Sequence, residues 1–156
     1  MNKTFRGTIQ EDEQVRVRLS TNDGLTGYKI AKLQGMPMDT MGSSNTANEA
    51  ILSVWSVEPG YVPGSSGTNY VNFDAPTLLG VFYFLRDQGV VAVTSETIII
   101  DDKKFNQDIF VLYGDSQTNN VGFNYYLELE QVKLDLSEAT VATLRDMRGN
   151  YTNQDP

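Results

Sequence analysis

The sequence predicts an all-β protein, an antiparallel β-sandwich that is jelly-roll-like, with about eight or nine strands and one short C-terminal helix. Three observations predict this class. One segment alternates apolar and polar residues with a period of two, most other apolar runs are β-branched and aromatic, and these runs are bounded by Gly, Asp, Asn or Pro. Many short strands separated by turn residues are typical of a sandwich, a jelly roll or a small barrel.

The first expected strand covers residues 14–19, where three apolar residues alternate with Gln and Arg. The segment TNDGLTG (21–27) follows it, and its Asn, Asp and Gly residues tolerate positive φ. We therefore expect a hairpin connection there, leading to a second strand at 28–36. Residues 35–48 (GMPMDTMGSSNTAN) have neither a helical nor a strand period, which predicts a long loop.

The middle of the chain predicts further strands separated by turns. The segment AILSVWSV (50–57) is β-branched and aromatic, which favours a strand. Residues 58–69 contain two prolines and three glycines and are expected to form a surface loop. The remaining strands are expected at 70–73, 78–86, 90–101, 108–114 and 121–136.

The end of the chain changes period and predicts a short helix. Ser137 can cap its start, an acidic residue follows in the first turn, and Gly149 is placed as a C-terminal stop. We expect the helix at about 138–148. The chain then reads as one β-sandwich domain over 1–148, ending in this helix, with a polar tail at 149–156.

The composition excludes many kinds of catalytic site. The 156 residues contain no cysteine and no histidine. Disulfides, thiolate metal sites, imidazole-ligated zinc and Ser-His-Asp hydrolysis are therefore excluded. We expect no enzymatic activity, no cofactor and no bound metal.

The charge and hydropathy pattern bears on partners and location. Twelve Lys and Arg against twenty Asp and Glu give a formal net charge of −8, so nucleic acid is an unexpected partner. No apolar stretch has the length of a signal peptide or of a membrane-spanning helix, so we expect no membrane association and synthesis in the cytosol.

Glu128 and Glu130 are the one acidic pair that could perform catalysis. In an extended strand they share a face with Tyr126 and Val132, while Tyr125 and the intervening leucines point the other way. A glycosidase uses two such carboxylates, and this spacing does not rule one out. The ordinary interpretation is that both glutamates lie on the solvated face of a half-buried strand.

Two acidic clusters could supply oxygen ligands for calcium. They are Glu11, Asp12 and Glu13, and Asp101, Asp102 and Asp108. Their spacing matches no calcium loop, and two lysines follow directly after Asp102, which favours a solvated turn.

Methionines and tyrosines in the expected loops are candidate contacts with a partner protein. Flexible methionines and amphipathic tyrosines are favoured at contact surfaces. The candidates are Met36, Met38, Met41, Tyr61, Pro63 and Tyr70. A rival interpretation is a carbohydrate- or receptor-binding groove that uses Tyr61, Tyr70 or Trp55 with nearby Asp or Asn. Apolar runs such as VFYFL and ETIII would also favour a homo-oligomer if their edges were exposed.

Five phrases in order along the chain carry a family resemblance. They are KTFRG, LSTNDGLTGYKIAKLQGMP, TLLGVFY, FNQDIFV and NYYLELEQVKLDLSEATVATLRDMR. Together they resemble small virion structural proteins of tailed bacteriophages, especially marine ones. The segment 38–68 fits this pattern least well.

The resemblance implies a non-enzymatic building block of a phage particle, made in the cytoplasm of the host bacterium and located in the virion. Such proteins are often decoration or cement subunits of the capsid, or components of the neck and tail. The implied partners are the major capsid protein or neck and tail proteins. The resemblance transfers no functional residue to this chain.

Overall fold

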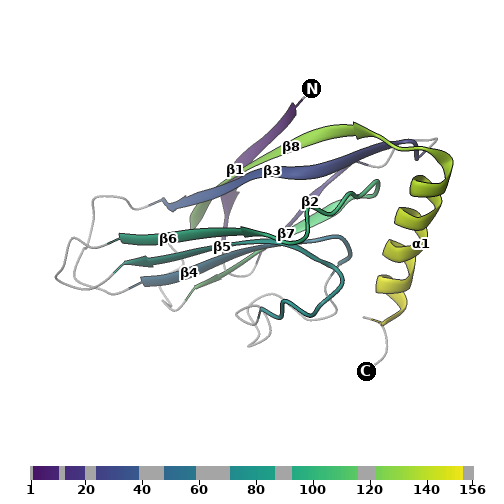
Figure 1. The fold of residues 1–156 in the computed structure, drawn as a ribbon. Helices are drawn as coiled ribbons and strands as arrows, with labels where there is room; N and C mark the ends of the chain where they lie inside the picture. The colour runs from purple at the N-terminus through teal and green to yellow at the C-terminus, as the bar shows by residue number, and fades with distance from the viewer. Residues whose placement is uncertain are drawn as a thin grey trace.

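The computed structural model describes residues 2–10, 13–19, 24–38, 48–58, 71–86, 93–115 and 122–152. Within them it confirms the all-β class, because eight strands form two antiparallel sheets and one helix follows (Figure 1). The strands are β1 (Asn2–Ile9), β2 (Gln14–Val17), β3 (Thr26–Pro37), β4 (Asn48–Trp55), β5 (Leu78–Arg86), β6 (Val93–Ile99), β7 (Ile109–Asp115) and β8 (Phe123–Lys133). The helix is α1 (Leu136–Thr152).

The strand order is that of a jelly roll. One sheet has the order β1-β8-β3 and the other β2-β7-β4-β5-β6. A jelly roll arises when eight strands pair as first with eighth, second with seventh, third with sixth and fourth with fifth, and the ribbon wraps around one core. Three of these pairs are ladders here. In the fourth, β6 stays in the sheet of β5 and meets β3 at the sandwich edge, where Thr97 Oγ1 donates a hydrogen bond to Leu33 O (2.9 Å).

The core between the two sheets is centred on Phe123, the first residue of β8. Its ring stacks on Tyr113 with 5.1 Å between centroids, and it meets the rings of Phe82 and Phe84 at 6.3 and 5.9 Å. Aromatic pairs at such spacings add about 0.5–1.5 kcal/mol each beyond the area they bury. Further along β8, alternate side chains enter the same core. Their inward direction confirms the period of two predicted for this strand.

A second apolar cluster covers the outer face of the five-stranded sheet. It consists of Trp55, Leu78, Val81, Phe110 and Leu112. Val71 and Ala75, from the segment before β5, pack against it. The strand expected at 70–73 is wrong for its described part, 71–73, because the Asn72 side chain accepts a hydrogen bond from Asp74 N (2.9 Å) and forms a turn. Tyr70 lies outside the described residues.

The hairpin expected at 21–27 is also wrong. β2 pairs with β7 and β3 pairs with β8, so the chain crosses from one sheet to the other between them. Gly24 does adopt a positive φ of 65° there. β3 continues to Pro37, because it pairs with β8 along its length, so the long loop expected from residue 35 begins later; residues 39–47 lie outside the described part.

The strand expected at 78–86 matches β5 in both ends. The other expected strands correspond to β4, β6, β7 and β8 with shifted ends. Residues 90–92, expected at the start of the sixth strand, lie outside the described part. β1 had no expected counterpart.

The helix begins earlier and ends later than predicted. Asp135, not Ser137, is its cap: Asp135 Oδ1 accepts from Glu138 N (2.8 Å), and Glu138 Oε2 accepts from Asp135 N (3.2 Å). This reciprocal pair satisfies two backbone donors at the helix start. The stop predicted at Gly149 is wrong, because the helix continues to Thr152; an interior glycine costs a helix only about 1 kcal/mol. Residues 153–156 of the expected tail lie outside the described part.

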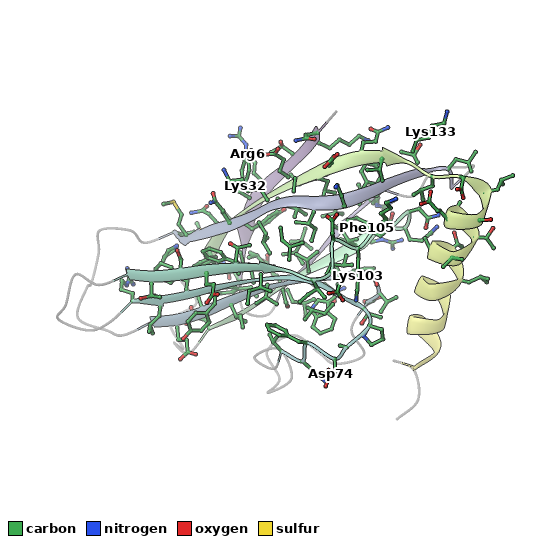
Figure 2. All side chains as sticks on the ribbon, in the orientation of Figure 1. Arg6, Lys32, Asp74, Lys103, Phe105 and Lys133 are labelled. Atoms are coloured by element: carbon green, nitrogen blue, oxygen red, sulfur yellow. The ribbon has the colours of Figure 1, made fainter. Side chains whose placement is uncertain are left out.

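A buried asparagine fixes α1 to the end of the sandwich. Asn106 Nδ2 donates to Gly24 O (3.0 Å), to Thr143 Oγ1 (2.9 Å) and to Ala139 O at a longer 3.4 Å. The preceding residue, Phe105, which is labelled in Figure 2, exchanges two backbone hydrogen bonds with Tyr28. The connection between β6 and β7 is thereby tied to β3 on one side and to the helix on the other.

The close approach of the two sheets at Gly35 gives a prediction. A Cβ at Gly35 would collide with the Phe123 ring and lie 2.8 Å from both Asn124 O and Leu52 Cδ1. Gly35→Ala should therefore lower the free energy of unfolding by about 1–3 kcal/mol, as overpacking of a core does. Urea titration followed by circular dichroism measures it.

Gly80→Ala is the matched control, since it also replaces a glycine within a strand. Its Cβ would meet Ile30 Cδ1 at 3.3 Å, the end of a side chain that can move. A Gly35→Ala loss no larger than that of Gly80→Ala would contradict the close approach described here.

Candidate functional site

The outer face of the three-stranded sheet presents polar side chains in rows across β1, β8 and β3, and we call it the outer sheet face. From one end the rows are Thr8-Asn124-Met36, Arg6-Tyr126-Gln34, Thr4-Glu128-Lys32 and Asn2-Glu130-Lys29. The register shift between Ile30 and Lys32 places both lysines on this face. The arrangement confirms that the two glutamates share a face with Tyr126.

Both glutamates make ordinary surface contacts. Glu128 Oε1 accepts a hydrogen bond from Asn2 Nδ2 (2.6 Å), and Glu130 pairs with Lys29 (3.4 Å). Asp102 also pairs with Lys29 at 3.4 Å, and the charges of Asp102 and then Glu130 raise the pKa of this lysine. Because the fold favours the charged form of Lys29, this charge stabilises the fold at pH values below the ordinary lysine pKa. The contribution is lost as the pH rises through the raised pKa. These contacts are those of a solvated strand face.

A shallow groove of about 570 Å³ lies over the first two rows, and we call it the outer groove. It is lined by Arg6, Gly7, Thr8, Gln34, Gly35, Met36, Asn124, Tyr125 and Tyr126. Arg6 is the one charged residue of this lining, which includes no acid. Lys32 lies beside it, with its Nζ 5.8 Å from the centroid of the Tyr126 ring. The groove is therefore a cationic, amide-rich and aromatic surface.

A glycine leaves room for a tyrosine ring on the inner side of this sheet. Gly7 and Gly35 are the register partners of Tyr125 on either side. A Cβ at Gly7 would lie 2.9 Å from the Tyr125 hydroxyl, so only glycine leaves room for the ring. Partial burial raises the pKa of the Tyr125 phenol. The ring packs against the core, on the side of the sheet opposite the groove.

The expected partner contacts are only partly described. Met36 lines the outer groove and is 52% exposed, and Met38, just after β3, is 47% exposed. Met41, Tyr61, Pro63 and Tyr70 lie outside the described residues. Trp55, a candidate for a sugar-binding groove, is buried in the outer cluster of the five-stranded sheet, where its Nε1 donates to Ser53 Oγ (2.9 Å). That use of Trp55 is wrong.

Two members of the acidic clusters pair with basic side chains, Asp102 with Lys29 and Asp108 with Arg16. Asp101 and Asp102 form a turn with positive φ angles of 53° and 48°. Asp108 accepts hydrogen bonds from Leu19 N (2.8 Å) and from Arg16, whose guanidinium it also pairs with at 2.7 Å. Glu11 and Asp12 lie outside the described residues. Within the described part of the chain, no group of three or more acids is placed to hold a metal ion.

Three large apolar side chains in the described part of α1 are exposed, and we call them the α1 stripe. Leu136, Val141 and Leu144 are 76%, 64% and 51% exposed. Leu144 comes eight residues after Leu136 and three after Val141, so all three lie on one broad side of the helix, which they share with the exposed Ser137 and Thr140. Ala139 and Ala142 form the opposite, buried side. The sequence does mark Val141 and Leu144 as an apolar side of the expected helix, but no local signal marks the outer groove. No strand was expected at 2–9, so Arg6 was not placed on a sheet face. Leu136 was not counted with the helix because the helix was expected to start at 138.

Comparisons with known proteins give no family assignment. No protein-family model matches the chain, and no curated protein matches its sequence. Among the described residues, no helix is long and apolar enough to cross a membrane. The class that the fold and the surface define is an all-β jelly-roll sandwich with a terminal helix.

The surface role of the two glutamates gives a prediction. Replacing Glu128 and Glu130 together by Gln should lower the free energy of unfolding by less than about 1 kcal/mol, because exposed polar contacts contribute little. Urea titration measures the change. The same preparations, tested on acidic and neutral polysaccharides, should show no difference in cleavage.

Asp108→Asn is the matched acid-to-amide control. Its carboxylate is only 11% exposed and holds both Arg16 and Leu19 N, so its loss should cost about 1–3 kcal/mol. A double glutamate variant as unstable as Asp108→Asn would show that these acids support the fold. Polysaccharide cleavage by the unaltered chain that is lost in the double glutamate variant would show that the chain is a glycosidase.

Proposed function

We propose that this chain is a non-enzymatic structural subunit of a tailed-bacteriophage particle, which decorates or cements the capsid by binding neighbouring subunits. The exposed apolar stripe on α1 is the observation that carries this proposal. The ordered sequence phrases that resemble phage virion proteins support the choice of particle, and the jelly-roll sandwich is compatible with a building block.

The α1 stripe has the character of a contact surface. Three large aliphatic side chains face water on one helix, although the rest of the described sandwich buries most of its large apolar residues. Burying such a side chain completely contributes about 1.5–3 kcal/mol, so covering even part of the stripe would stabilise a complex. Exposed apolar patches on otherwise polar proteins mark interaction sites. A neighbouring virion subunit is the occupant that we propose.

The same contact repeated by particle symmetry explains how a weak surface could act as cement. Linked copies of a binding site raise occupancy far above that of one copy. A subunit that binds the mature shell more tightly than the loose one stabilises the mature shell by mass action. The chain then functions in the virion as one of many equivalent copies.

The α1 stripe gives the test of this proposal. Val141→Asp together with Leu144→Asp should leave the chain folded, because both side chains are exposed, but should weaken its binding per copy at least about tenfold. Co-sedimentation with particles that lack the chain measures binding. Calorimetry should show that the variant no longer raises the disruption temperature of those particles.

Phe73→Asp is the matched control, since Phe73 is 54% exposed and lies on the turn before β5 rather than on α1. Equal binding by the α1 variant and the unaltered chain would contradict the α1 contact. Equal disruption temperatures with and without the unaltered chain would contradict a cement role. A sixfold or twelvefold ring of the isolated chain would favour the neck or tail instead of the capsid.

A further inference from the structure

The outer groove contains a positively charged side chain that is not neutralised by an acid in the described part of the protein. Arg6 is exposed, lines the groove, and has no hydrogen-bond or ion-pair partner among the described residues. By contrast, Arg16 and Lys29 are paired with carboxylates. The groove lining includes no acid, in a chain with a net charge of −8. Its charge therefore favours an anionic ligand, and a guanidinium fits a carboxylate with two parallel hydrogen bonds.

The remaining lining suits a ligand with many hydroxyl groups. Gln34 and Asn124 offer amide donors and acceptors, and Thr8 adds a hydroxyl. A ligand hydroxyl can therefore either donate a hydrogen bond to these side chains or accept one from them. Tyr126 adds an aromatic ring with a polar tip. Lys32, over that ring, places a second positive charge at the edge of the groove. The volume of about 570 Å³ lies within the range of small-molecule sites.

The backbone under the groove argues against an added peptide strand. β8 is paired with β1 on one side and with β3 on the other along both groove rows. Its backbone donors and acceptors are thereby used, and strand addition needs a free edge. Recognition in the groove must come from side chains projecting from the face, which suits a compact ring.

We infer that the outer groove binds a carboxylate-bearing sugar, such as a uronic acid unit of an acidic polysaccharide. Arg6 pairs with the carboxylate, the ring of Tyr126 packs against the sugar ring, and the amides of Gln34 and Asn124 bind its hydroxyls. This site is separate from the α1 stripe and does not depend on the proposed role in a particle.

Trigalacturonate added to the ¹⁵N-labelled full chain tests the inference. Backbone amide signals of Gly7, Gly35 and Asn124 should shift, and the affinity measured by calorimetry should fall at high salt. Arg6→Gln should weaken binding about tenfold. Lys133→Gln, the same charge change at the far end of β8, should bind like the unaltered chain (Figure 2).

Three outcomes would overturn the assignment. The first is the absence of shifts at the groove amides, and the second is equal binding of a neutral trisaccharide. The third is tighter binding of a hexaglutamate peptide at the same amides, which would assign the groove to an acidic peptide. Because Arg6 is exposed, the amide spectrum of Arg6→Gln should otherwise match that of the unaltered fold, which separates lost binding from lost structure.

Discussion

The alternation of side chains along β8 is the constraint on which the rest of the structure depends. β8 is the middle strand of its sheet, so every second residue must enter the core and the others must face water. Phe123, Leu127 and Leu129 are fully buried on one side, while Tyr126 and Glu128 lie on the other. A shift of one residue would bury the glutamates and expose the leucines. The register that stabilises the core is therefore also the register that builds the outer groove.

The end of β8 sets the position of α1 in a similar way. Two residues after the strand, Asp135 caps the helix, which leaves almost no freedom in the connection. Asn106 then fixes the helix by its Ala139 side against the β6–β7 connection. Small alanines permit this close approach, and the larger aliphatic residues of α1 are left facing outward. The exposed stripe is thus a consequence of which side of the helix carries the anchor.

The sequence predicted most strands because their periods and bounding residues are local signals. The alternation in 14–19 and 121–136 and the aromatic, leucine-rich run at 78–86 all correspond to strands. The hairpin at 21–27 failed because the same turn residues also suit a crossing between sheets, and the choice depends on β7 and β8 far along the chain. β1 carries no clear strand signal because its outward residues are polar and its inward positions include Lys3 and Gly7 beside Phe5 and Ile9.

The candidate sites were less predictable for a physical reason. Arg6, Gln34 and Tyr126 are far apart in sequence and meet only through the ladders on both sides of β8. Met36 was proposed as a contact from its residue type, and it does line the groove, but Trp55 has the same aromatic character and is buried. Residue type alone does not distinguish these cases, because burial is decided by which sheet face a position occupies.

The two proposed surfaces lie toward opposite ends of β8. About nine residues of extended chain separate Tyr126 from the start of α1, which corresponds to about 30 Å. Changes at sites so far apart contribute nearly independently, so substitutions in the α1 stripe should not alter the outer groove. The rigid ladder between them fixes their relative position. A subunit held by its helix would keep the outer groove structurally intact, so attachment and ligand binding can coexist in one small chain.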